Sequence, residues 1–389
     1  MHPGRRPFKS DVRRILARRS VLLFLLLASF STANYAKPHV SVAVRTDSTE
    51  IVFSSGEQAN RVRAAEEALT NCRSALANLP ETQPTGVCEL RRMDDIELTR
   101  AADLLPKAPT PLFLWRFQHD EATVYLAGTV HVLKESLYPL PQPYLDAYAA
   151  TQKLVFEVDL SRYPPTEMQR QTMAYATLAE QSLRQSLPAE IYQQLVSAGS
   201  IYGLPVGQMQ AFKPMLAFQQ LGALGFKAMG YDPAFGVDHY FGQLGEREAE
   251  NILQLETLEF QLGLLFNQPL DVQTALLEQA LAELGDIERS TSALVRAYLN
   301  GDDASMLALI QDQDGEHPLT RAFHAQLLDQ RNRGMAKTIE AYLQTNQSYL
   351  VLVGAAHTVG AYGIVALLES AGFTATRIAS NETLPKPQQ

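Results

Sequence analysis

Two segments far apart in the chain each combine an apolar run with a glycine and with a histidine three residues after it. The first is Val124-Tyr-Leu-Ala-Gly128-Thr-Val-His131, and the second is Leu350-Val-Leu-Val-Gly354-Ala-Ala-His357. Four consecutive apolar residues predict a short buried strand in each segment, and a glycine permits a tight turn as the strand leaves the sheet. Open α/β sheets bind ligands at the carboxyl ends of their strands, so both histidines lie where functional side chains are expected.

The segments around these two units predict further strands. Leu112 to Phe117, a charged turn at 119–121 and the strand into His131 begin the main domain, and Lys153 to Asp159 predicts another strand. Glu157 and Asp159 lie two residues apart in it and are therefore expected on one face.

Helices are expected between the two histidine units. From Pro164-Pro165 to about Leu343 the chain is predicted to be mostly helical. One helix is indicated by Ile252, Leu255, Leu258, Leu262 and Leu265, which recur at helical spacing. Another is predicted from about Leu319 to Leu343, and a closing helix over Gly360 to Ser370. The predicted fold is mixed α/β, with a central sheet that carries both histidine units and a long helical insert between them.

The N-terminal residues have the order of a secretory signal peptide. Arginines between Arg5 and Arg19 precede the apolar run Val21 to Leu27, and small residues follow it. The run is shorter than the roughly 20 residues that span a bilayer. We therefore predict that residues 1–36 are removed and that the mature protein is periplasmic or secreted and does not span a membrane. The twin-arginine route is a second reading of the arginine pairs.

The two cysteines predict one local disulfide. Cys72 and Cys88 both follow the predicted cleavage point, and two cysteines close in the sequence of an exported protein usually form a disulfide bond. It would close a small N-terminal module over 37–108, which a proline-bearing linker separates from the main domain over 109–380. Residues 381–389 are predicted to be a disordered tail.

Composition and missing motifs exclude several classes of function. The chain of 389 residues has a net charge of −9 and 46% hydrophobic residues, and its predicted mature region lacks a basic stripe of the kind that contacts nucleic-acid phosphates. It contains no Gly-x-Ser-x-Gly elbow, no phosphate-binding glycine loop and no His-Glu-x-x-His helix. Serine hydrolases, nucleotide-binding proteins and zincins are therefore disfavoured, and the sequence leaves the oligomeric state open.

Histidines and one carboxylate are the first candidates for chemistry. A largely neutral imidazole at a strand end suits a metal ligand or a general base; the alternative for His131 and His357 is a histidine that caps a helix or binds a carbonyl. Glu157 lies in an apolar strand, where burial of its charge requires a cation, a metal or a proton donor. An arginine at the sheet edge is the non-catalytic alternative, and Asp159 is expected to cap a turn.

Other charged residues allow two readings each. Glu256 and Glu259 are three apart on the predicted helix and point in related directions, but such carboxylates are commonly solvated. Arg331-Asn332-Arg333 is either surface charge or the source of a guanidinium that clamps a carboxylate or an oxyanion.

The chain resembles the TraB/GumN family, which includes the Tiki-type membrane proteases. The resemblance extends from about Phe113 to Ile378 and rests on six landmarks in order. They are Leu126-Ala-Gly-Thr-Val-His-Val-Leu133, Phe156-Glu-Val-Asp159, Gly236-Val-Asp238, Leu255-Glu-Thr-Leu-Glu-Phe-Gln261, Arg331-Asn332 with Met335, and Val353-Gly-Ala-Ala-His-Thr-Val-Gly360.

The resemblance implies a metal-dependent hydrolase related to erythromycin-esterase-like and ChaN-like proteins. It places His131, His357 and Glu157 at a divalent-metal site. It does not distinguish Mn, Co and Zn as the bound ion. Asp238, Glu256 and Arg331 match further family positions that are expected to line the same pocket. His239, in a third Gly-x-x-His match, falls at no family histidine position.

These observations predict an exported hydrolase that cleaves peptide bonds, with a peptide or small molecule as substrate. Glu157 is expected to be a metal ligand or the base that activates water, and Arg331 to stabilise the oxyanion. Glu256 is a further candidate catalytic residue, and Asp238 and Asn332 are candidate binding residues. The alternatives are an envelope protein that sequesters a peptide or ligand in the same crevice, and a structural protein with buried, metal-free histidines.

Overall fold

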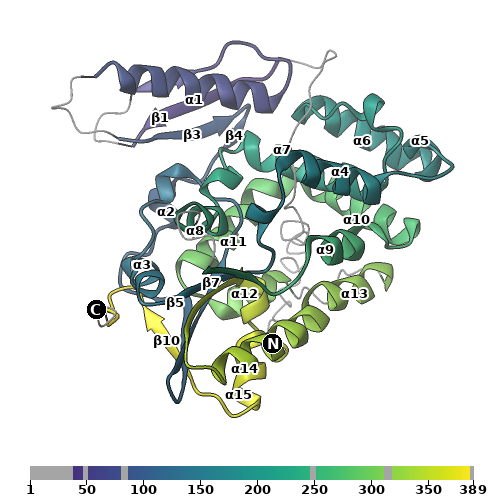
Figure 1. Cartoon of the computed structure of the whole chain (residues 1–389). Helices are drawn as coiled ribbons and strands as arrows, with labels where there is room; N and C mark the ends of the chain where they lie inside the picture. The colour runs from purple at the N-terminus through teal and green to yellow at the C-terminus, as the bar shows by residue number, and fades with distance from the viewer. Residues whose placement is uncertain (1–37, 47–50, 80–85, 246–250, 311–317, 386–389) are drawn as a thin grey trace, which may run out of the picture.

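The computed structural model describes residues 38–46, 51–79, 86–245, 251–310 and 318–385 (Figure 1). The predicted signal peptide lies outside these ranges. Within them, no helix combines the length and the apolar character needed to cross a bilayer. Of the predicted tail, residues 381–385 are described and Leu384 is buried.

The N-terminal part forms a four-stranded antiparallel sheet with one helix packed on it. The sheet order is β2-β1-β3-β4. Its elements are β1 (Ser41–Arg45), β2 (Val52–Ser54), α1 (Arg61–Ala77), β3 (Cys88–Met93) and β4 (Ile96–Glu97). The Asn60 side chain accepts a hydrogen bond from the Arg63 amide and so caps α1.

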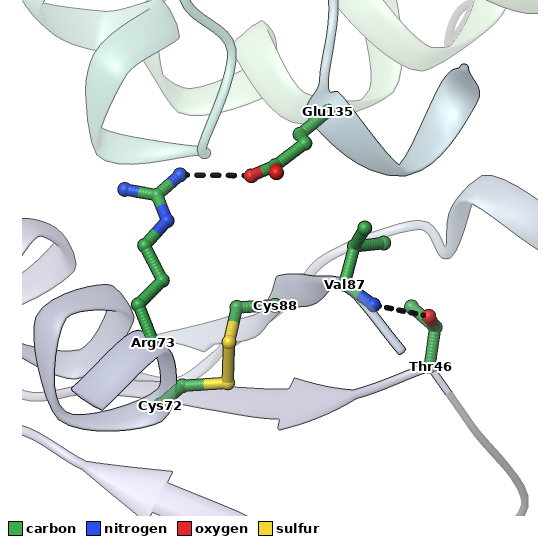
Figure 2. The surroundings of a disulfide bond; sticks show 6 residues. All are labelled: Thr46, Cys72, Arg73, Val87, Cys88 and Glu135. Atoms are coloured by element: carbon green, nitrogen blue, oxygen red, sulfur yellow. Dashed lines mark hydrogen bonds and ion pairs between the residues drawn. A yellow bond between two sulfur atoms is a disulfide. The ribbon is translucent and has the colours of Figure 1, made fainter. Parts of the chain in front are cut away.

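The predicted disulfide is confirmed. Cys72 of α1 is bonded to Cys88 at the start of β3, so the bond joins the helix to the sheet beneath it (Figure 2). One residue further along α1, Arg73 pairs with Glu135 of the main domain at 3.1 Å. Lys227 also pairs with Glu66 of α1, so two surface ion pairs link α1 to the main domain.

The main domain is built on a six-stranded mixed sheet, which confirms the predicted α/β class. Its order is β10-β5-β6-β9-β7-β8. The strands are β5 (Pro111–His119), β6 (Ala122–Thr129), β7 (Lys153–Phe156), β8 (Ile252–Gln254), β9 (Ser348–Gly354) and β10 (Ala375–Ala379).

Four neighbouring strands of this sheet run parallel. β6 pairs with β9, β9 with β7, and β7 with β8, all in the same direction, while β5 and β10 are antiparallel additions at one edge. All but the first residue of β9 and all but Thr123 of β6 are buried. Near-continuous apolar runs of this kind are typical of parallel strands that are covered on both faces.

Helices occupy most of the chain between β7 and β9, as predicted. They are α4 (Pro165–Ala176), α5 (Leu183–Ser186), α6 (Ala189–Tyr202), α7 (Pro214–Ala228), α8 (Val237–Gly245), α9 (Leu258–Phe266), α10 (Leu270–Glu283), α11 (Ile287–Leu299), α12 (Asp303–Ile310), α13 (Pro318–Ala325) and α14 (Arg331–Leu343). Outside this insert lie α2 (Ala101–Leu104), α3 (Gln142–Ala149) and α15 (Ile364–Ser370).

Short turns of other helix types complete the chain. They are η3 (Glu135–Leu137), η4 (Leu160–Arg162), η5 (Val206–Met209), η6 (Pro233–Phe235), η8 (Leu284–Asp286), the π-turn η9 (Gln326–Gln330) and η10 (Ala355–Thr358). The helix predicted over Leu319 to Leu343 is thus α13, η9 and α14 in direct succession, and the closing helix begins at Ile364 rather than Gly360.

The expected helix around Ile252 is partly wrong. Ile252 belongs to β8, which pairs in parallel with β7, and helix α9 begins only at Leu258, after Thr257 caps it through a bond from the Phe260 amide. Glu256 therefore precedes the helix and does not share a helical face with Glu259. A three-residue strand is too short to show alternation, and Ile252 fits the helical spacing of the leucines that follow it.

Candidate functional site

The carboxyl ends of the four parallel strands lie at one edge of the sheet, and each is followed closely by a predicted site residue. In register, Thr129 of β6 pairs with Gly354 of β9, and Phe156 of β7 pairs with Leu352 and with Gln254 of β8. His131, Glu157, Glu256 and His357 come one to three residues after these ends. The edge of the sheet thus assembles one group from residues that are far apart in the sequence.

His131 and His357 are each held through Nδ1. His131 Nδ1 lies 2.7 Å from Asp238 Oδ2, and His357 Nδ1 lies 2.6 Å from Asn332 Oδ1. Asn332 donates its side-chain N–H to the Tyr362 carbonyl, so its oxygen faces His357 and accepts the Nδ1–H. Among the described residues, neither Nε2 atom has a hydrogen-bond partner.

Glu157 lies beside the two imidazoles. Its Oε1 accepts the backbone N–H of Gly354 at 2.7 Å and is 3.7 Å from His357 Nε2. Its Oε2 accepts from Arg331 Nη2 at 2.5 Å and from Gln261 at 3.2 Å. Burial alone raises the pKa of a carboxyl group, but the positive charge of Arg331 outweighs burial and holds the pKa of Glu157 well below its ordinary value.

Arg331 joins Glu157 to a second buried carboxylate. Its Nε and Nη2 donate to Glu256 at 2.8–3.0 Å, and its Nη1 donates to the Leu327 carbonyl at 3.3 Å. The Arg331 side chain is 7% exposed and that of Glu256 is 8% exposed. Burial opposes the charge of the guanidinium, but the two carboxylates raise its pKa above the ordinary value. Three charges are therefore buried as one hydrogen-bonded unit.

The two imidazoles differ in protonation. Burial lowers the pKa of His131, but Asp238 and Glu157 outweigh it and raise that pKa to about 9. Burial and the charge of Arg331 lower the pKa of His357 to about 3, against the opposite effect of Glu157. At neutral pH, His357 thus carries a lone pair on Nε2, whereas His131 is protonated and must lose a proton before it binds a metal.

A cavity of about 150 Å³ opens beside this group. Its polar side is formed by His131, His357, Arg331 and Gln261. The side chain of His131 is 39% exposed, so the group is accessible from outside the domain.

Other candidates lie elsewhere. Strand β7 ends at Phe156, so Glu157 and Asp159 do not share a strand face. Asp159 caps the turn η4 and pairs with Arg162. Glu259 is exposed on α9. The exposed His239 bonds to Gln243 one helical turn later on α8.

Two residues of the site were not predicted. Thr129 donates to Asp238 Oδ1 at 2.8 Å and to the Val353 carbonyl at 3.1 Å, and Gln261 donates to Glu157 and Glu256. Thr129 lies two residues before His131, a position that shares its direction along an extended chain. The place of Gln261 in the site can be predicted only when it is known that α9 begins shortly after the end of β8.

The donor atoms of this group suit a divalent metal, although the geometry is not that of a complete metal site. Among the described residues, no three or more His, Cys, Asp or Glu side chains are arranged to hold an ion as they stand. A methyl group on Gly354 would nevertheless lie 3.4 Å from His131 Nε2, 3.5 Å from Glu157 Oε1 and 3.6 Å from His357 Cδ2. Two imidazoles oriented by oxygen partners and one carboxylate are the usual elements of a metal site.

Of the two motif glycines, only Gly128 is required for space. Gly128 lies within β6 and Gly354 ends β9, and neither has a positive φ. A Cβ on Gly128 would lie 3.0 Å from the Ala355 backbone and 3.0 Å from Phe113 Cβ. The predicted role in a tight turn is therefore wrong for Gly128, which lies inside its strand and is explained by close packing. Gly354 ends β9 directly before the turn η10.

Alanine is expected to lower stability at Gly128 but to leave stability nearly unchanged at Gly354. Gly128→Ala overpacks two strands and should lower the free energy of unfolding by about 1–3 kcal/mol. Gly354→Ala places its methyl at ordinary contact distance, so we expect near-normal stability, with any ion or ligand excluded from the space beside the histidines. Urea unfolding and metal titration of both variants test this; equal destabilisation of the two would contradict it.

Comparisons with known proteins identify one family and several distant relatives. The sequence profile of the TraB/PrgY/gumN family matches residues 113–377. The chain is 23% identical over 325 residues to a protein named Metalloprotease TIKI homolog from Amphimedon queenslandica. This alignment covers 71% of this chain and 63% of the relative. The chain is 22% identical over 311 residues to Metalloprotease TIKI2 from Danio rerio, covering 67% and 60%.

A bacterial relative is also similar. An uncharacterized protein of Treponema pallidum is 22% identical over 260 residues, covering 63% of this chain and 76% of the relative. The chain spans less than two thirds of the length of the two TIKI relatives. No solved structure matches the chain.

Proposed function

Since the chain belongs to the TraB/PrgY/gumN family, we propose that it is an exported, metal-dependent hydrolase that cleaves peptide bonds. The observation that supports this most is the convergence of His131, His357 and Glu157 at the ends of three parallel strands. Similarity to two proteins named metalloproteases adds to it.

His131 and His357 would hold the metal through Nε2, together with Oε1 of Glu157. A divalent ion bound there supplies Lewis acidity toward a carbonyl and lowers the pKa of water. Asp238 and Asn332 act as positioning residues, because each fixes the Nδ1 side of one imidazole. Thr129 in turn fixes the carboxylate of Asp238.

As the alternative to metal ligation, Glu157 is proposed to accept the proton of the attacking water through Oε1, because Oε2 is already bound by Arg331 and Gln261. Arg331 keeps Glu157 ionised, and Glu256 holds Arg331 in place. Nε and Nη2 of Arg331 are bound to carboxylates, whereas Nη1 carries two hydrogens and donates one to Leu327. We propose that Nη1 stabilises the oxyanion of the intermediate.

Elemental analysis of the purified protein, combined with a peptide-library assay with and without chelator, tests this function. We expect a divalent metal that His131→Ala and His357→Ala each lose while the fold remains, because each removes one imidazole ligand. His239→Ala is the matched control, since His239 lies in the third Gly-x-x-His match and outside the site. Normal metal content in both site variants would refute the metal centre.

A further inference from the structure

The cavity beside the site is lined by both polar and apolar residues. Besides the polar ones, six aliphatic side chains from α9, α11, α12 and η9 contribute to its wall. They are Leu264, Leu265, Leu294, Met306, Leu327 and Leu328. Several of these leucines remain partly exposed, although the helices that carry them are packed in the core.

The size of the cavity fits one amino-acid side chain. At about 150 Å³ it is below the range of roughly 300–1,000 Å³ that is typical of pockets for whole drug-sized ligands. An apolar cavity of about 150 Å³ engineered into another protein holds one benzene molecule. A leucine, methionine or phenylalanine side chain is of comparable size.

The charge of the lining excludes acidic and basic side chains. The cavity wall within the described residues contains no carboxylate and no lysine. Its charged groups are already paired: Arg331 with Glu157 and Glu256, and the protonated His131 with Asp238. A charged substrate group would therefore be desolvated without a partner, which is costly.

We infer that this cavity is a specificity pocket for one apolar side chain of a peptide substrate, in the residue next to the cleaved bond. The inference rests on the proposed hydrolysis of peptides. Its position follows from the lining, because His131, His357 and Arg331 border the same space as the six aliphatic residues. The π-turn η9 carries Leu327 and Leu328 and leads directly into Arg331. One segment therefore contributes both apolar residues of the pocket wall and the guanidinium of the charged group.

Cleavage of a peptide library tests the pocket. We expect leucine, methionine or phenylalanine to be preferred over alanine by about 10- to 200-fold at one position beside the cleaved bond, and aspartate and lysine to be rejected there. Leu294→Trp fills the cavity and should shift the preference to alanine and glycine, whereas Leu294→Ala enlarges it and should admit tryptophan. Leu160→Trp, at a surface position on η4 that is 42% exposed, is the matched control and should keep the wild-type profile.

A binding measurement separates this inference from the proposed function. If no peptide is cleaved, saturation-transfer NMR still reports on the pocket. The two probes are N-acetyl-L-leucinamide and the α-amide of N-acetyl-L-aspartic acid, which keeps its side-chain carboxylate. We expect binding of the leucine compound alone, and its loss in Leu294→Trp. Cleavage without side-chain preference, or equal binding of both compounds, would overturn the pocket; failure of cleavage together with selective binding would overturn only the hydrolase.

Discussion

Replacement of Arg331 by methionine is expected to lower the free energy of unfolding by about 3–5 kcal/mol at neutral pH. The substitution keeps much of the apolar stem but leaves the buried carboxylates of Glu157 and Glu256 without their cation. Urea unfolding followed by circular dichroism measures the loss. Arg333→Met is the matched control two residues along α14, since Arg333 is exposed, and a loss no larger than that of the control would contradict the prediction.

The pH dependence of this loss identifies its cause. Arg331 holds the folded-state pKa of Glu157 below its unfolded value, so the pair stabilises the fold above the unfolded pKa of about 4.3, and this contribution disappears as pH falls through the folded pKa. Without Arg331, burial raises the pKa of Glu157, and acid protonates the carboxylate. The difference between wild type and Arg331→Met should therefore shrink as pH falls from 7 to 4; an unchanged difference would indicate lost packing instead.

The Glu157→Gln variant should lose peptide hydrolysis by about 10²- to 10⁴-fold in kcat/KM, the usual contribution of a general base. The amide keeps the shape of the side chain but cannot accept the proton. Arg331 remains paired with Glu256, so the loss of stability should be smaller than that of Arg331→Met. Steady-state kinetics on the best peptide of the library measures the effect.

Glu259→Gln, on the exposed side of α9, is the control for the same chemical change and should retain wild-type turnover. A direct measurement of peptide affinity distinguishes the competing binding function. If Glu157→Gln and wild type bind peptide equally and neither cleaves it, the chain is a sequestering protein and not a hydrolase.

The parts of the fold that were predicted correctly are those with long apolar signals. β6, β7 and β9 are apolar runs with clear ends, and the helices of the insert are long enough to show their period. β8 was missed because three residues show no period, and Glu256 was consequently assigned to the wrong element. The sequence also placed Glu157 within a strand, whereas it lies just after one.

The convergence of the site was not predictable from periodicity. Spacing gives the direction of Arg331 and Asn332 relative to their helix, but it does not say which side of α14 faces the strand ends. The order of parallel strands brings β9 between β6 and β7, and nothing in the local sequence specifies that order. The family resemblance supplied the grouping of His131, Glu157 and His357, and the sheet order explains it physically.

The central position of β9 has a consequence for how the protein is made. β9 separates β6 from β7 in the sheet although it is translated almost 200 residues after β7, so the sheet cannot close until the C-terminal part of the chain has been synthesised. Contacts between such distant segments form slowly, because the entropy cost of closing the long loop between them must be overcome first. The same strand delivers His357, so a nascent or truncated chain holds only part of the site. The group of His131, Glu157 and His357 therefore cannot assemble before the C-terminal part of the chain is in place.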